Sequence, residues 1–168
     1  PMNGVLGMAR LLLGGNIAGE DLSRVKDIVH SGESLLEILN DLLDISKLGA
    51  GKLEIEDIPF SPLRIVEDVV SVMAPRAKEQ NLAIASFVDT SLPLELLGDP
   101  NRVRQILLNL VSNAIKFTHD GEVSLTVRSM GMTAHVADLR FDIRDSGIGI
   151  NSEAISRLFE PFSQADDT

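Results

Sequence analysis

The chain has 168 residues, of which 44% are hydrophobic and 24% are charged, and this suits one or two small globular domains. Its formal net charge of −10 argues against nucleic acid as a partner, because proteins that bind a phosphate backbone usually carry basic patches. No apolar run reaches the roughly 20 residues that span a bilayer, so no direct membrane contact is expected in this segment. The absence of cysteine excludes disulfides and thiolate metal sites, and it fits a cytoplasmic location.

The first fifty residues show the pattern of a helical hairpin. Residues 5–13 look like the end of a helix, 14–16 (Gly-Gly-Asn) predict a turn, and a second helix is expected over about 21–48. Its apolar side chains fall into two adjacent rows: Leu22, Val25, Val29, Leu36, Leu39 and Leu43, and beside them Ile28, Leu35, Leu42 and Ile45. Such a stripe is too wide for one two-helix contact, which favours a four-helix bundle formed by dimerisation. The alternative is a hairpin packed on its own downstream domain.

The segment that follows predicts short strands and one helix. Residues 52–56 alternate like a short strand, and 82–88 predict a second one. Ser61 is placed to cap the helix that lies between them, and Pro75 is expected to kink or split that helix. Gly98-Asp99-Pro100 indicates a loop.

The helix predicted over 101–117 carries two distinct faces. The expected core face comprises Val103, Ile106, Leu107, Leu110, Ala114 and Phe117. A separate polar row comprises Arg102, Gln105, Asn109, Asn113 and Lys116. Asn is a poor helix former, so two Asn residues four positions apart need a reason. Amide oxygens can ligate Mg²⁺ and Lys116 can meet a phosphate, so this row suits a metal-bound polyphosphate, although a plain polar surface stripe is an equal alternative for the helix taken alone.

Two further strands are expected near 122–128 and 137–144, and they look like a hairpin with one face buried. A glycine-containing turn, residues 145–149 (Asp-Ser-Gly-Ile-Gly), follows the second strand. Its glycines permit close approach to a ligand, and Asp145 can accept a hydrogen bond from an exocyclic amine such as that of adenine. Taken alone, this pattern is better explained by a plain strand-exit turn. Residues 157–162 place two phenylalanines around a proline, as a loop anchor or a small hydrophobic turn.

Taken together and in this order, these motifs resemble the sensor histidine kinases. Residues 99–118 resemble the N box of that family, 142–150 its G1 box and 158–164 its F box. Residues 1–7 resemble the segment just after the phosphoacceptor motif, and 39–47 resemble the end of the second dimerisation helix. The resemblance covers nearly the whole chain, and the residues of these boxes are most similar to those of the hybrid class.

The resemblance implies a role for each matching position. Asn113 would coordinate an Mg²⁺ ion that bridges the ATP phosphates, Asn109 would assist at the metal or the phosphates, and Lys116 would contact phosphate. These three residues would form the catalytic set. Asp145 would recognise the adenine amino group. The remaining nucleotide-binding positions are Phe117, within the N box, Gly147 and Gly149, which would shape the pocket and hinge its lid, and Phe159 and Phe162, which would anchor that lid.

The resemblance also implies an α+β fold in two parts. Residues 1–50 would be a dimerisation and phosphoacceptor hairpin, half of a dimeric four-helix bundle. Residues 51–168 would be an α/β sandwich of the histidine kinase, gyrase and Hsp90 ATP-binding type. The expected activity is autophosphorylation from Mg-ATP followed by transfer to a response-regulator receiver domain. The alternatives are a non-catalytic module that dimerises with partner kinases and a gyrase-like or Hsp90-like ATPase, the latter disfavoured by the hairpin and the F box.

The sequence departs from the family pattern at two places. The acceptor histidine of the family precedes a proline that matches Pro1, so the acceptor is expected upstream of this chain. His30, His119 and His135 do not lie in that pattern and are interpreted as ordinary positions. The second glycine box, expected after Gln164, is also absent. The chain is therefore expected to be a fragment that does not phosphorylate itself and binds ATP only weakly.

Overall fold

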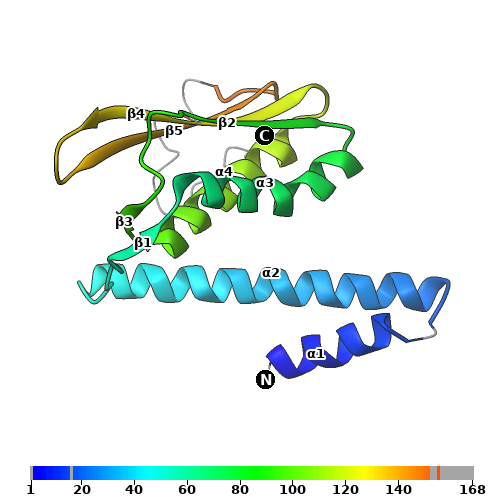
Figure 1. Ribbon diagram of the computed structural model, residues 1–168. Coiled ribbons are helices and arrows are strands. Elements are labelled where there is room, and N and C mark those ends of the chain that lie inside the picture. The colour runs from blue at the N-terminus through cyan, green and yellow to red at the C-terminus, as the bar shows by residue number, and fades with distance from the viewer. Residues whose placement is uncertain (1, 16, 152–154, 156–168) are drawn as a thin grey trace. The chain divides into compact units, whose positions relative to one another are not determined.

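The computed structural model describes residues 2–15, 17–151 and 155, and it divides the chain into two compact units, Pro1–Glu54 and Ile55–Thr168 (Figure 1). The predicted lid anchors Phe159 and Phe162 lie outside the described residues. The helices and strands, in chain order, are α1 (Met2–Leu13), α2 (Glu20–Gly49), β1 (Ile58–Phe60), α3 (Pro62–Glu79), β2 (Ala83–Val88), β3 (Leu96–Gly98), α4 (Pro100–Phe117), β4 (Glu122–Met132) and β5 (Ala137–Asp145). In the part of the chain that the structure describes, no helix is long and apolar enough to cross a membrane.

The first unit is the predicted helical hairpin. Leu6, Ala9 and Val25 are buried between α1 and α2, and Gly32 brings the two helices close together. A Cβ atom at Gly32 would lie 2.7 Å from Cδ2 of Leu6, so the glycine makes room for that leucine. Most of the wide apolar stripe remains uncovered within the single chain, including Ile28, Leu35, Leu39, Leu42 and Ile45. The hairpin is confirmed, whereas its dimerisation remains a prediction.

The prediction of a short strand over 52–56 is wrong. That segment has no regular structure, and β1 lies just after it, where it pairs antiparallel with β3. The loop predicted at 98–100 accordingly begins inside a strand, because Gly98 pairs with Ile58. Instead of strand pairing, the backbone N–H of Glu56 donates a hydrogen bond to the Asp99 carboxylate (3.2 Å). This contact between residues far apart in the sequence fixes the segment before α4, and no local pattern encodes it.

The second unit is a sheet of β2, β4 and β5 that is covered on one face by α3 and α4 (Figure 1). β2 runs parallel to β4, and the connection between them contains β3 and α4. β4 and β5 pair antiparallel, as predicted for a hairpin, with an irregularity in register between Ser129 and Gly131. The α+β fold class is thus confirmed, with a helical hairpin followed by an α/β sandwich.

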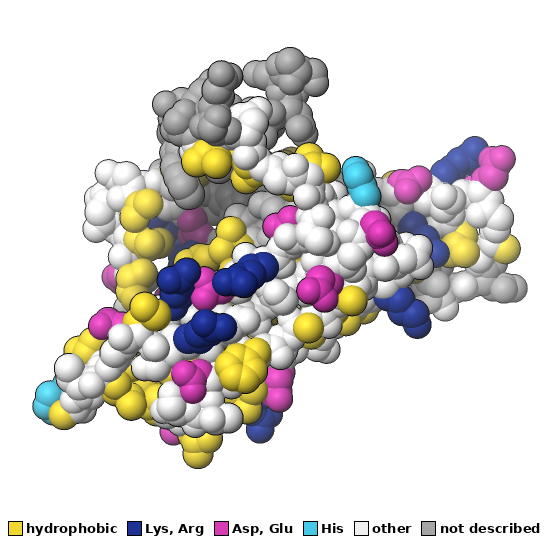
Figure 2. All heavy atoms as spheres, turned by 90° about the horizontal axis from the view of Figure 1, so that it is seen from above, with side chains coloured by type: hydrophobic (Ala, Val, Ile, Leu, Met, Phe, Trp, Pro, Cys, Tyr) yellow, Lys and Arg dark blue, Asp and Glu magenta, His cyan; other side chains and the backbone are white. Residues whose placement is uncertain are grey.

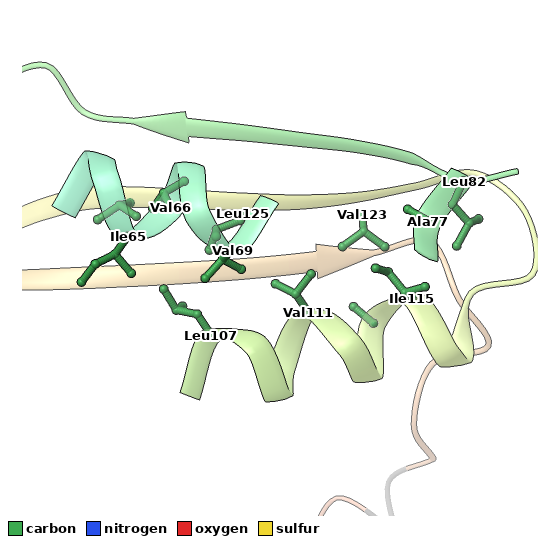
Figure 3. Packing of buried hydrophobic residues seen from close by; sticks show 12 residues of the cluster. Ile65, Val66, Val69, Ala77, Leu82, Leu107, Val111, Ile115, Val123 and Leu125 are labelled. Carbon is green, nitrogen blue, oxygen red and sulfur yellow. The ribbon is translucent and has the colours of Figure 1, made fainter. Parts of the chain in front are cut away.

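The core of this unit lies between the sheet and the two helices (Figure 3). Val123, Leu125 and Val127 are buried on β4, as their alternation predicts. On α4 the buried side chains are Leu107, Val111, Ala114 and Ile115. The prediction that Ile106 and Leu110 belong to this core is wrong, because they are 59% and 45% exposed. The spacing misled because both lie at the edge of the apolar arc, between the core and the amide row, where periodicity alone does not set the boundary.

Helix α3 starts as predicted and ends at Glu79, next to the end predicted at about Gln80. The Ser61 side chain accepts a hydrogen bond from the Arg64 backbone N–H (3.4 Å), and Pro62 occupies the first turn, where its missing N–H costs nothing. The expected split at Pro75 does not occur, since one helix runs through this residue to Glu79. Pro75 and Ser71, whose carbonyl loses its helical donor, are both exposed, so water can hydrogen-bond the freed group.

Candidate functional site

The start of α4 is fixed by Asp99, a carboxylate with only 8% of its surface exposed. It caps the helix by accepting a hydrogen bond from the Arg102 backbone N–H (3.0 Å), and it also accepts the one from Glu56. The hydrogen bond from Arg102 is the main reason why the pKa of Asp99 lies below its ordinary value, and it outweighs the opposing effect of burial. Asp99 thereby anchors the helix that carries the predicted site.

The predicted polar row lies along an exposed side of α4. Arg102 donates a hydrogen bond through Nη1 to Oε1 of Gln105 (2.9 Å). One turn further on, Asn113 donates through Nδ2 to Oδ1 of Asn109 (3.3 Å), and both amides are exposed. The two amide groups therefore form a pair at the surface of the helix, and the exposed apolar side chains of Ile106 and Leu110 lie between this pair and the core.

The C-terminal turn of α4 places Lys116 and Phe117 next to one another. The Lys116 ammonium group lies 4.8 Å from the centroid of the Phe117 ring, a distance typical of a cation–π contact. Thr118 ends the helix, and its buried hydroxyl group donates a hydrogen bond to the Ala114 carbonyl (2.7 Å). This use of Thr118 as a cap was missed in the sequence, where the residue has no pattern that distinguishes it from a loop threonine.

The glycine turn after β5 is held by side chains of its own. The Asp145 carboxylate accepts a hydrogen bond from the Gly147 backbone N–H (2.9 Å). Ser146 bonds to the chain just before β4: its hydroxyl group donates to the Asp120 carbonyl (3.0 Å) and accepts from the Glu122 N–H (3.0 Å). Sequence reasoning also missed Ser146, because its partners lie more than twenty residues away.

The turn also packs directly against the end of α4. The Ile148 N–H donates a hydrogen bond to the Phe117 carbonyl oxygen (3.3 Å). A Cβ atom on Gly147 would collide with that same oxygen, so only glycine fits there, and Gly149 has a positive φ of 70°. The glycine turn thus contacts α4 at Phe117, four residues after Asn113, and the two predicted motifs lie next to one another.

The cavity of about 620 Å³ recorded for this unit lies elsewhere. Its walls come from β1, β3 and the far end of the β4–β5 hairpin, and none of the predicted ATP-binding residues that the structure describes lines it. Within the described part of the chain, no group of three or more His, Asp or Glu side chains is arranged to hold a metal ion. A metal at the candidate site would therefore depend on the amide row.

Comparison with known proteins identifies this arrangement. Residues 98–168 match the family described as histidine kinase-, DNA gyrase B- and HSP90-like ATPase. The whole chain is 41% identical over 168 residues to the sensor protein GacS of Pseudomonas syringae pv. syringae and spans 18% of its length. It is 39% identical over 166 residues to the signal transduction histidine-protein kinase BarA of Escherichia coli K12, where 99% of this chain again spans 18% of the relative. The chain is a homologue of the hybrid sensor histidine kinases.

A solved structure agrees with this assignment to the histidine kinases. The crystal structure of full-length ShkA in complex with AMPPNP superposes with a TM-score of 0.75 at 40% identity, and the match covers 99% of this chain and 35% of ShkA. Residues 98–168 of this histidine kinase homologue therefore belong to an ATPase domain of the histidine kinase type. It spans less than a fifth of the length of GacS and BarA.

Proposed function

We propose that this histidine kinase homologue binds Mg-ATP between the amide row of α4 and the glycine turn. Asn109, Asn113 and Lys116 face the metal and phosphates, and Asp145 accepts a hydrogen bond from the adenine amino group. The hydrogen bond from Ile148 to the Phe117 carbonyl supports this proposal most directly, because it holds the glycine turn against the end of the helix that carries the amide row. The ATP analogue in the ShkA structure gives independent support.

The residues present fit a magnesium ion that is shared with a nucleotide. Mg²⁺ prefers oxygen ligands, keeps several waters and is usually held by one or two protein groups together with substrate phosphates. The Asn109–Asn113 hydrogen bond uses Nδ2 of Asn113 as donor, which leaves Oδ1 of Asn113 pointing away from that bond. Bound there, the ion would neutralise phosphate charge, and Lys116 would add a positive charge one turn further along the helix.

The reaction that this site supports is transfer of the terminal phosphoryl group. A histidine imidazole nitrogen attacks the γ-phosphorus of ATP, the bond to the β–γ bridging oxygen breaks, and ADP leaves. The contribution of this chain is to hold the nucleotide in line and to stabilise its charge, since such transfer needs positioning more than covalent chemistry. We place the acceptor histidine upstream of residue 1, and the next acceptor is an aspartate of a receiver domain.

The hairpin supplies the second half of the proposal. Leu35, Leu39 and Leu42 are 43%, 45% and 50% exposed on α2, and burial of this stripe in a second copy would form a four-helix bundle. A homodimer would present the acceptor histidines to the ATP-binding domains. Since ATP and receiver domains are intracellular, this part of the protein would work in the cytoplasm.

The metal role can be tested by substitution of Asn113 with alanine in the full-length protein. We expect Asn113→Ala to abolish autophosphorylation, measured as incorporation of radiolabel from γ-labelled ATP, with the folded state retained because the side chain is exposed. Asn101→Ala is a matched control: it removes an exposed Asn from the same helix, whose amide donates only to Glu56 (3.2 Å). Unchanged labelling of Asn113→Ala would contradict the proposed metal role.

The same experiment separates the alternative, a non-catalytic module that dimerises with and regulates partner kinases. The exposed apolar stripe on α2 would serve such a module equally well. A full-length protein with no histidine at the acceptor position, and no labelling in the unsubstituted form, would favour the module. The paired amides on α4, together with the glycine turn beside the end of that helix, favour the kinase, because they suit a metal-bound nucleotide.

A further inference from the structure

The hydroxyl group of Ser146 attaches the glycine turn to the segment that joins α4 to β4. It donates a hydrogen bond to the Asp120 carbonyl oxygen (3.0 Å) and accepts one from the Glu122 backbone N–H (3.0 Å). Gly121 lies between these two partners with a positive φ of 111°, and a Cβ atom there would collide with the hydroxyl oxygen. The segment therefore leaves room for the Ser146 side chain only because residue 121 is a glycine.

The same turn orients the carboxylate of Asp145. Its Oδ1 atom accepts a hydrogen bond from the Gly147 backbone N–H (2.9 Å). Its Oδ2 atom has no hydrogen-bond or ion-pair partner among the described residues. An ionised carboxylate only accepts hydrogen bonds, so Oδ2 is available to a donor such as an exocyclic amine. Ser146 lies between the acceptor and the donor of the Asp145–Gly147 hydrogen bond, so the place of its backbone sets the direction of that carboxylate.

We propose that Ser146 is a positioning residue for recognition of the adenine amino group, an inference that rests on the proposed function. Its hydroxyl group would not contact the nucleotide, since it bonds to the backbone at Asp120 and Glu122. It holds the turn in place, and the turn orients Asp145 toward the amine. The preference for ATP over a purine nucleotide without that amine therefore depends on Ser146.

Removal of this hydroxyl group should loosen the turn without detaching it. Two backbone hydrogen bonds remain: the Ser146 N–H donates to the Glu122 carbonyl oxygen (3.2 Å), and the Ile148 N–H donates to the Phe117 carbonyl oxygen (3.3 Å). Ser146 is also exposed, so Ser146→Ala leaves no cavity in the core. The variant should therefore remain folded while the orientation of Asp145 becomes less well defined.

The test compares Mg-ATP with the magnesium complex of purine riboside triphosphate, which lacks the amino group, in calorimetric titrations of the full-length protein. We expect Ser146→Ala to weaken binding of Mg-ATP about fivefold, as the loss of one hydrogen bond would. Binding of the nucleotide without the amine should not change, because Asp145 has no donor to accept from in that complex. Ser146→Thr keeps the hydroxyl group and should restore the affinity for Mg-ATP.

Ser124→Ala is the matched control. Ser124 follows the buried Val123 on β4 and lies on the face of the sheet that α3 and α4 leave open, where Figure 2 shows acidic and basic side chains side by side. Its hydroxyl group has no hydrogen-bond partner among the described residues. This variant should bind both nucleotides like the unsubstituted protein.

Two results would overturn the inference. The first is equal weakening of both nucleotides by Ser146→Ala, which would indicate a general structural role. The second is unchanged binding of Mg-ATP by Ser146→Ala when Asp145→Asn weakens it, which would mean that Asp145 is oriented without the hydroxyl group. Unchanged binding of Mg-ATP by Asp145→Asn, or no binding by the unsubstituted protein, would instead overturn the proposed function, and this inference with it.

Discussion

At the scale of single residues, Gly147 has the sharpest steric requirement in the candidate site. Its missing side chain lets the turn rest on the Phe117 carbonyl oxygen, and a Cβ atom there would crowd both that oxygen and Oδ1 of Asp145. We expect Gly147→Ala in the full-length protein to weaken Mg-ATP binding about tenfold or more, because small misplacements of binding groups cost that much. Calorimetric titration with Mg-ATP measures this loss. Gly7→Ala in α1, where nothing lies within 4 Å of the added atom, should leave the affinity unchanged.

Asp99 predicts a pH dependence of stability. Its pKa in the folded state lies below the ordinary value of 3.8, so the fold favours the charged carboxylate. The stability that this charge contributes is fully present above pH 3.8 and is lost as the pH falls through the lowered folded pKa. The difference in melting temperature between the unsubstituted chain and Asp99→Asn should therefore shrink as the medium is acidified below this value. A difference that stays constant or grows would show that Asp99 does not act through its charge.

The side chains that carry the site differ in how far the sequence reveals them. Asn109 and Asn113 stand out because asparagine is unfavourable inside a helix, so their presence signals a use. Ser146 and Thr118 have no such signal: a serine beside a glycine and a threonine after a helix are ordinary turn residues. Their partners, the backbone groups around Asp120 and the Ala114 carbonyl, become visible only when the strands and helix are assembled.

At the scale of elements, the exposed apolar stripe of helix α2 predicts that the chain forms a dimer. Leu42 is half exposed in the single chain, and in a symmetric dimer each of the two copies would bury it. We expect Leu42→Glu to raise the dimer dissociation constant by roughly a hundredfold or more, since each buried leucine contributes about 1.5–3 kcal/mol. Sedimentation equilibrium measures this change. Val72→Glu is the control, because Val72 is 62% exposed on α3, outside the hairpin. Retention of the dimer by Leu42→Glu would refute the bundle.

Long elements could be predicted from sequence and short ones could not. Helix α4 is bounded by a cap at Asp99 and a turn at Gly121, so its limits were within a residue of the prediction. β1 and β3 are three residues each and exist only because they pair with one another across more than thirty positions. β1 also contains a proline, which argues against a strand when the sequence is read alone. The proline is tolerated there because both strands of a two-stranded sheet are edge strands.

At the scale of the whole molecule, charge and hydrophobicity are divided between surfaces with different tasks. The apolar excess gathers on the hairpin, and the amides and glycines gather where α4 meets β5. The global charge of −10 does not reveal this division, because it carries no information on which side chains become neighbours. The strand register decides which side chains of the sheet become neighbours.

The parallel pairing of β2 with β4 has a consequence for how the site comes into being. Two parallel strands cannot be joined by a tight turn, so β2 and β4 need a long crossover connection. That connection contains α4. The pairing of β2 with β4 tethers α4 at both ends and holds it over the sheet. We therefore expect formation of the candidate nucleotide site to be coupled to the pairing of these two strands during folding.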